Sequence, residues 1–124
     1  MLHSDFSLTD GSKEPLVNLA RLKEITLGEV ELQRELIAAF IEILRANLEA
    51  IQDALPAGDC LTVSRCAHQI KGAAANVGAA SIKEMAAELE CQANKQNLVN
   101  ATQLLVSLSD LRSQLQEFIS NYLS

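Results

Sequence analysis

The sequence predicts an all-α fold, an up-down-up-down antiparallel four-helix bundle with a short additional N-terminal helix. Apolar residues recur at helical three-and-four spacing along most of the chain, and no alternating strand pattern competes. Hydrophobic residues make up 48% of the 124 residues and aromatic residues only 3%, so Leu, Ile, Val and Ala must form the core. The long helices are separated by short connections, which force neighbouring helices to run antiparallel.

One domain preceded by an arm is expected. Residues 1–15 contain Ser, Asp, Gly, Lys and Pro without periodicity, which indicates a flexible N-terminal arm. Residues 16–124 then form the bundle domain, which is long enough for a single core. Its first helix is short, because Asn18 is a favourable N-cap and Gly28 ends the pattern soon afterwards.

Two long helices follow. The segment 26–29, Thr-Leu-Gly-Glu, has the spacing of a capping box and predicts a helix over about 29–54. Pro-Ala-Gly at 56–58 then breaks the chain, and Asp59 can cap the next helix. Gly78 is well placed as the residue that follows this helix.

The last two helices complete the bundle. The segment 81–84, Ser-Ile-Lys-Glu, again has capping-box spacing and predicts the start of the fourth helix, which ends at the polar stretch 94–97. The final helix has the strict three-four alternation of a helix packed at a shallow angle. Its apolar positions are Ala101, Leu104, Leu108, Leu111, Leu115, Phe118 and Tyr122.

Charge and cysteine usage exclude several classes of function. The formal net charge of −6 argues against nucleic acid as a partner, because phosphate binding needs a basic face. The three cysteines, Cys60, Cys66 and Cys91, form no C-x-x-C pair and are expected to be reduced, with Cys66 in the core. A zinc site would need more ligands than these residues and His3 supply at any familiar spacing. The chain has neither an apolar leader nor a run of membrane-spanning length, so we expect a cytoplasmic protein with no membrane partner.

His68 is the candidate functional residue. At about 100° per residue, the apolar residues of its helix lie within roughly 60° of the direction opposite His68. They are Val63, Cys66, Ile70, Ala73, Ala74 and Val77. The residues that lie within roughly 60° of His68 in the adjacent turns are small or basic, namely Ser64, Arg65, Lys71, Gly72 and Ala75. Leu61, two turns earlier, also lies about 20° from this direction. The imidazole is therefore expected to be exposed.

Gly72 and Lys71 strengthen this interpretation. A glycine inside a helix costs about 1 kcal/mol relative to alanine, so Gly72 needs a reason other than helix stability. Its missing side chain leaves space through which a bulky group can reach His68. Lys71 lies on the same face and could neutralise an anion on the ring. Taken singly, each residue could also be an ordinary surface feature.

The segment that begins at His68 reads His68-x-Ile70-Lys71-Gly72-Ala73-Ala74-x-x-Val77-Gly78-Ala79. This string resembles the signature of the histidine phosphotransfer (HPt) domains of multistep two-component phosphorelays. The similarity extends over roughly residues 16–124, because the short first helix and the bundle also fit. It implies that His68 accepts a phosphoryl group from a receiver-domain aspartyl phosphate and relays it to another receiver.

The resemblance also implies roles for neighbouring residues. The distal ring nitrogen would carry the phosphoryl group, and Glu90, 22 positions later, would orient the imidazole through the other nitrogen. The alternative is that Glu90 is an ordinary solvated glutamate. Lys71 would screen the phosphoryl charge, Gly72 would give steric access, and Arg65 and Gln69 would lie at the rim.

Cofactors and partners follow from the same resemblance. The chain would need no cofactor or metal of its own, because the Mg²⁺ belongs to the receiver, and it would be a covalent carrier rather than an enzyme. Its partners would be response-regulator receiver domains and a hybrid sensor histidine kinase, with the chain itself a monomer. The expected docking residues are Leu61, Ser64, Arg65, Gln69, Ala75, Leu22 and Ile25. Leu61 could instead be packed under the first helix.

Two other functions stay open. One is the phosphoacceptor module of a chemotaxis-type histidine kinase, which an ATP-binding domain phosphorylates; the other is a helical adaptor that is never phosphorylated. No ATP-binding module follows in this sequence, which favours the relay, and Met1 together with a complete bundle by Ser124 favours a free-standing protein. The sequence does not identify the cognate kinase, the receivers or the pathway output.

Overall fold

The computed structural model of the chain describes residues 16–123. The expected arm, 1–15, and the side chain of Tyr122 lie outside the described residues. Within them the fold is all-α, as predicted, and contains no strand. The elements are α2 (Leu19–Ile25), α3 (Val30–Ala54), α4 (Cys60–Val77), α5 (Ala80–Asn94), α6 (Ala101–Phe118) and a terminal π-helix, η1 (Ile119–Leu123).

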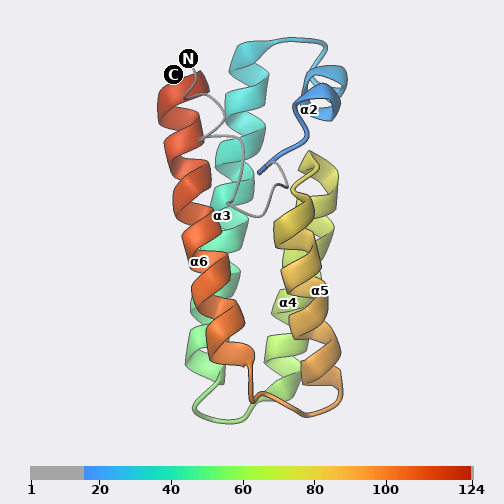
Figure 1. Cartoon of the computed structure of the whole chain (residues 1–124), viewed down its shortest axis with the longest axis vertical. Coiled ribbons are helices and arrows are strands. Elements are labelled where there is room, and N and C mark those ends of the chain that lie inside the picture. The colour runs from blue at the N-terminus through green and yellow to red at the C-terminus, as the bar shows by residue number, and fades with distance from the viewer. Residues whose placement is uncertain (1–15, 124) are drawn as a thin grey trace.

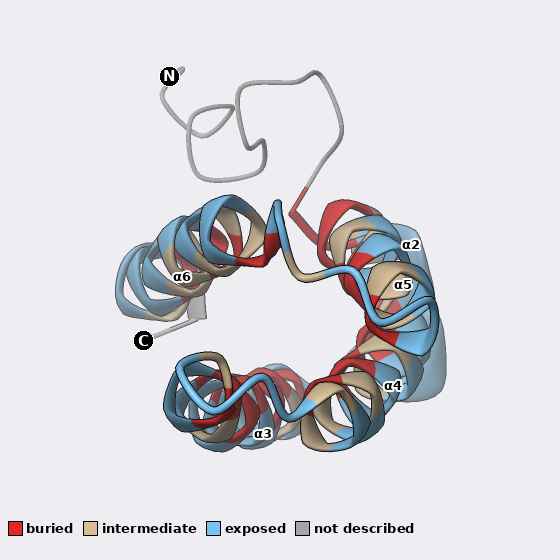
Figure 2. Cartoon of the chain, turned by 90° about the horizontal axis from the view of Figure 1, so that it is seen from below, coloured by how far each residue is buried: buried red, intermediate tan, exposed pale blue. Residues whose placement is uncertain are grey.

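The four long helices alternate in direction along the bundle axis, and the short α2 leans against one end (Figure 1). Helix α4 packs between α3 and α5, while α6 closes the bundle by packing against the same two helices. Seen along the axis, buried residues line the interior that the four helices enclose (Figure 2). The short connections therefore produce the antiparallel neighbours that the sequence predicts.

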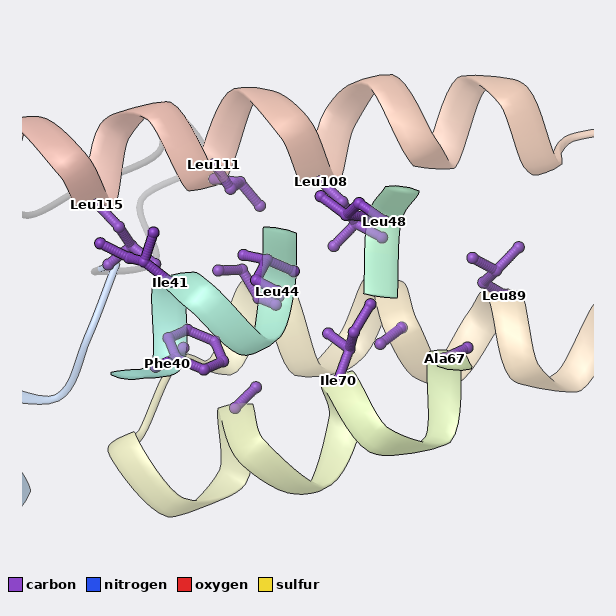
Figure 3. Packing of buried hydrophobic residues seen from close by; sticks show 14 of the residues in the cluster. Phe40, Ile41, Leu44, Leu48, Ala67, Ile70, Leu89, Leu108, Leu111 and Leu115 are labelled. Carbon is purple, nitrogen blue, oxygen red and sulfur yellow. The ribbon is translucent and has the colours of Figure 1, made fainter. Parts of the chain in front are cut away.

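The core consists almost entirely of aliphatic side chains from all four long helices (Figure 3). The two buried aromatic residues of the described chain are Phe40 and Phe118. On the facing sides of α4 and α5 several buried positions are alanines, including Ala67, Ala74 and Ala86. Small side chains let two helix backbones approach closely, which brings the polar edges of α4 and α5 within reach of each other.

Several helix ends form as predicted. The Asn18 side chain accepts a hydrogen bond from the Arg21 N–H (3.1 Å), and the Asp59 carboxylate accepts from the Thr62 N–H (3.1 Å). The Thr62 hydroxyl also donates to Asp59 (2.6 Å), and these two bonds lower the pKa of that carboxyl. Gly78 ends α4 in the left-handed conformation, with φ of 72°.

Both predicted capping boxes are wrong. The left-handed residues Leu27 and Gly28 separate Thr26 from α3, so its hydroxyl instead donates to the Leu22 carbonyl (2.7 Å). Helix α3 begins after Glu29 without a side-chain cap. Ser81 is buried inside α5, which starts two residues earlier than the box would allow.

Helix α2 is fixed to the C-terminal end of α4. The Asn18 N–H donates to the Gly78 carbonyl (3.0 Å), and Arg21 Nε donates to the Asn76 carbonyl (3.2 Å). A cation at this position complements the partial negative charge of the α4 C-terminus. A Cβ on Gly78 would lie 2.7 Å from the Asn18 Cβ, so only glycine allows this close approach.

Candidate functional site

The orientation of α4 determines what its exposed face presents. Its buried residues are Val63, Ala67, Ile70, Ala74 and Val77. Cys66 and Ala73, expected in the core, are only half-buried. At 100° per residue the buried face is therefore centred about 40° from the direction opposite His68, turned toward α5. As a result Gly72 points directly to solvent, and His68 leans toward α5.

His68 is exposed, as predicted, and contacts the neighbouring helix through one ring nitrogen. The side chain retains 67% of its accessible surface, and its Nδ1 lies 2.9 Å from Glu90 Oε2 of α5. Because a carboxylate only accepts hydrogen bonds, this contact places the proton of the neutral imidazole on Nδ1. Nε2 then carries an unshared electron pair, on a side chain that is two-thirds exposed.

Glu90 is the centre of a three-residue cluster. It is mostly buried, with 18% of its side-chain surface exposed, and its second oxygen, Oε1, lies 2.7 Å from Lys71 Nζ. The hydrogen bond from Lys71 lowers the pKa of Glu90, and the bond from His68 adds to this against the opposing effect of burial. The carboxylate is thus negatively charged near neutral pH. The sequence pointed to Glu90 as a partner of His68 but not to its ion pair with Lys71.

Gly72 leaves open space beside the imidazole. None of the described residues has an atom within 4 Å of the point that a Cβ on Gly72 would occupy, apart from the helix's own neighbouring backbone. Its backbone is ordinary helix rather than left-handed, so no conformational demand explains a glycine here. The structure therefore supports the interpretation of Gly72 as an opening toward His68.

The expected docking residues divide into two groups. Leu61 is 72% exposed, which excludes the alternative that it packs under the first helix. The other accessible residues of the set are Ser64, which is half-buried, and Arg65, Gln69, Ala75 and Ile25, which are exposed. Leu22 is fully buried, so its assignment to a docking surface is wrong. Because α2 sits on the end of α4, Leu22 is directed into the bundle and Ile25 outward.

The cluster borders a shallow hollow that the sequence did not indicate. This hollow, about 380 Å³ in volume, is lined by Lys71 of α4 and by a run of residues on and just after α5: Ala87, Glu90, Cys91, Asn94 and Lys95. The α5 residues recur at three-and-four spacing, which could have identified them as one helix face. Lys95 adds a second ammonium group to the lining of this hollow.

Other features offer no comparable chemistry. A hollow of about 420 Å³ between α3 and α6 is lined by side chains of both charges, including Arg45, Arg112 and Asp110, without a histidine or cysteine. Cys66 is half-buried beside the core, where burial raises the pKa of its thiol. Within residues 16–123, no three histidine, cysteine or acidic side chains are grouped as a metal site would require. No described helix has the length and apolar character needed to span a bilayer.

Comparison with known proteins agrees with the geometry of the site. The family model described as "Hpt domain" matches residues 35–121, which include His68, Lys71, Gly72 and Glu90. The fold is similar to the crystal structure of histidine-containing phosphotransfer protein B (HptB) from Pseudomonas aeruginosa PAO1, with a TM-score of 0.74 and 23% sequence identity. That match covers 87% of this chain and 97% of the other. Comparison with curated proteins gives no significant match. The chain therefore belongs to the Hpt domain family, as a histidine phosphotransfer domain of phosphorelays.

Proposed function

We propose that His68 is the phosphoacceptor, which takes a phosphoryl group from an aspartyl phosphate of one receiver domain and passes it to an aspartate of another. The observation that carries this proposal is the state of the imidazole. Nδ1 faces the Glu90 carboxylate at 2.9 Å, and the rest of the ring is exposed beside the open space at Gly72. This arrangement leaves Nε2 as an accessible nucleophile.

The transfer is a simple exchange of bonds. The electron pair of His68 Nε2 forms a bond to phosphorus, while the bond from phosphorus to the aspartyl oxygen breaks and its electrons remain on the aspartate. The imidazole, which keeps its proton on Nδ1, becomes a phosphoimidazolium cation. The Glu90 carboxylate stabilises this positive charge as it forms. The reverse sequence of bonds delivers the group to the second receiver.

Lys71 and Gly72 serve the incoming phosphoryl group. The Lys71 ammonium lies on the same face of α4 as His68 and is held 2.7 Å from Glu90 Oε1. A phosphoryl group on Nε2 would bring new anionic oxygens that attract this ammonium. Gly72 leaves room for these oxygens and for the receiver surface that presents them. Arg65 and Gln69, both exposed, lie near the rim of the same face.

The remaining machinery belongs to the partners. In this proposal the receiver supplies Mg²⁺ and the acidic pocket that stabilise the transferring phosphoryl group, so the chain acts as a covalent carrier without a cofactor. Response-regulator receivers and a hybrid sensor histidine kinase are the corresponding partners. The exposed docking residues Leu61, Arg65 and Ala75 surround His68 along α4 and suit such a surface.

Incubation with a phosphorylated receiver tests the proposal directly. The protein should acquire phosphate that is labile in acid and stable in alkali, as phosphohistidine is, and the His68→Gln variant should acquire none. Phosphotransfer profiling against a set of receivers would then identify the partners. Labelling of the His68→Gln variant would contradict His68 as the acceptor. Absence of labelling from every receiver would favour an adaptor, and labelling by an ATP-dependent kinase alone would favour the chemotaxis-type module.

A further inference from the structure

The line along which α4 and α5 pack against each other, here called the seam, has a second polar contact one helical turn from His68. Ser64 Oγ donates a hydrogen bond to Asn94 Oδ1 over 2.6 Å. Ser64 precedes His68 by four residues on α4, and Asn94 follows Glu90 by four residues on α5. In antiparallel helices these offsets place the two contacts side by side, about 6 Å apart along the seam.

The next position along the seam lacks such a contact. Lys71 follows His68 by three residues, and the residue three before Glu90 is Ala87, whose methyl group cannot bind an ammonium. Lys71 accordingly reaches back to Glu90. Polar side chains therefore join α4 and α5 at two levels. One is the hydrogen bond between Ser64 and Asn94, and the other is Glu90 with its partners His68 and Lys71.

The position of Asn94 makes its contact mechanically important. It is the last residue of α5, and the chain turns away immediately afterwards through Gln96, whose φ is 58°. The carbonyl groups of this last turn, those of Cys91, Gln92 and Ala93, accept hydrogen bonds from the N–H groups of residues 95–97, so the turn is capped within its own chain. The bond to Ser64 ties this last turn to α4. Glu90 lies one turn before it, so the same bond restrains the carboxylate that faces His68.

His68 depends strongly on that restraint. Its side chain is two-thirds exposed, and no hydrogen-bond partner other than Glu90 contacts it among the described residues. A relative shift of the helices by about 1.5 Å along their axes, the rise of one residue, would lengthen the 2.9 Å contact to about 3.3 Å, at the edge of the hydrogen-bonding range. The tautomer of the imidazole and the availability of Nε2 would change with it.

We propose that Ser64 and Asn94 are positioning residues for the phosphoacceptor, which act through Glu90 to hold His68 as the Nδ1–H tautomer. This inference rests on the proposed function only for its kinetic consequence. Ser64 and Asn94 are uncharged, so their replacement by alanine leaves the formal charge around His68 unchanged. Any change in the imidazole must then come from geometry.

Nitrogen-15 NMR of the His68 ring in alkaline buffer, where the imidazole is neutral, is the main test. The wild-type protein should show chiefly the Nδ1–H tautomer, and Glu90→Ala should show the Nε2–H form that an unrestrained histidine prefers. Ser64→Ala and Asn94→Ala should each move the population toward the Glu90→Ala spectrum. Ser64→Thr, which keeps the hydroxyl, should restore the wild-type population. His3 is the only other histidine, and the His68→Gln spectrum identifies its signals.

Controls separate positioning from general loosening of the fold. Ser107→Ala removes a hydroxyl from a half-buried position on α6 and should leave the tautomer unchanged. Circular dichroism should show the same helix content in all variants. The double variant Ser64→Ala with Asn94→Ala should shift the tautomer no further than either single variant, because both remove one contact. Wild-type tautomer populations in both single variants would overturn the proposal.

A kinetic measurement with phosphoramidate, a small donor that needs no docking, completes the test. Ser64→Ala should lower the rate of His68 phosphorylation by about three- to tenfold, the range that one hydrogen bond is worth. An unchanged rate with a shifted tautomer would refute the link between the tautomer and reactivity. Failure of the wild-type protein to become labelled would refute the proposed function instead, while the tautomer would still decide the role of Ser64 and Asn94.

Discussion

Enlarging Gly72 is expected to change the stability and the transfer activity of the domain in opposite directions. A Cβ at this position meets open space, and the backbone is already helical. Alanine should therefore stabilise the fold by about 0.5 to 1 kcal/mol, the cost of glycine within a helix. For a domain of 124 residues this corresponds to a rise in Tm of about 2 to 5 °C. Gly72→Leu should also be at least as stable as the wild-type protein.

Transfer from a phosphorylated receiver should fall despite this gain in stability. A leucine at position 72 would project directly outward beside His68, and displacement of reacting groups by about 1 Å can lower a rate on the order of 100-fold. Gly72→Ala should have a smaller effect than Gly72→Leu. The assays are thermal unfolding and the rate of phosphoryl transfer, with Gln116→Leu on the exposed side of α6 as the control. A Gly72→Leu variant that transfers at the wild-type rate, or that unfolds more easily, would refute the reasoning.

Three further perturbations probe the cluster and its support. Lys71→Ala should slow phosphoryl uptake roughly ten- to hundredfold, the range that a hydrogen bond to a charged group is worth, while circular dichroism shows an intact fold; an unchanged rate would contradict charge screening. The pKa of Glu90 is lowered from 4.5 in the folded state, so the unfolded carboxyl binds its proton first as the pH falls. The contribution of ionised Glu90 to the free energy of unfolding should be complete above pH 4.5 and be lost as the pH falls through the pKa of Glu90 in the folded protein. Urea titrations of the wild-type and Glu90→Gln proteins across that pH range can measure it. Gly78→Ala should destabilise by more than the roughly 1 to 2 kcal/mol of a left-handed alanine, because its Cβ also meets Asn18, whereas Gly58→Ala, left-handed in open space, should show only that conformational cost. Equal losses in the two variants, from urea unfolding, would show that the contact with α2 is unimportant.

The sequence predicts the helices more reliably than their ends. Apolar spacing identified the five α-helices found in the described part of the chain, because burial of an aliphatic face is the dominant stabilising term. The predictions from the capping boxes at 26–29 and 81–84 were wrong, because a four-residue pattern is short and the left-handed residues Leu27, Gly28 and Gly78 change the direction of the chain nearby. Side-chain caps compete with such tertiary constraints, and a four-residue pattern contains no information about them.

Within the site, the sequence indicated the individual residues better than the contacts between them. His68 is exposed and Glu90 reaches its Nδ1, but the ion pair of Glu90 with Lys71 and the contact of Ser64 with Asn94 were not predicted. These contacts join residues that are 19 and 30 positions apart. They depend on the rotation of α4 and on the register of α4 against α5, which the alanine-rich core between these helices sets. A helical wheel treats one helix alone and cannot supply either quantity.

The distribution of charge over the bundle is uneven in a way that suits the proposed exchange. Helix α4 carries Arg65 and Lys71 and no acidic residue, whereas α3 and α5 on either side carry net charges of −3 and −2. A partner that presents an aspartyl phosphate would therefore be attracted to α4 and repelled by α3 and α5 on either side of it. Such an arrangement favours orientation and selectivity more than affinity. In the proposed mechanism Lys71, which Glu90 partly neutralises in the free protein, would turn to the phosphoryl oxygens once the group is on His68.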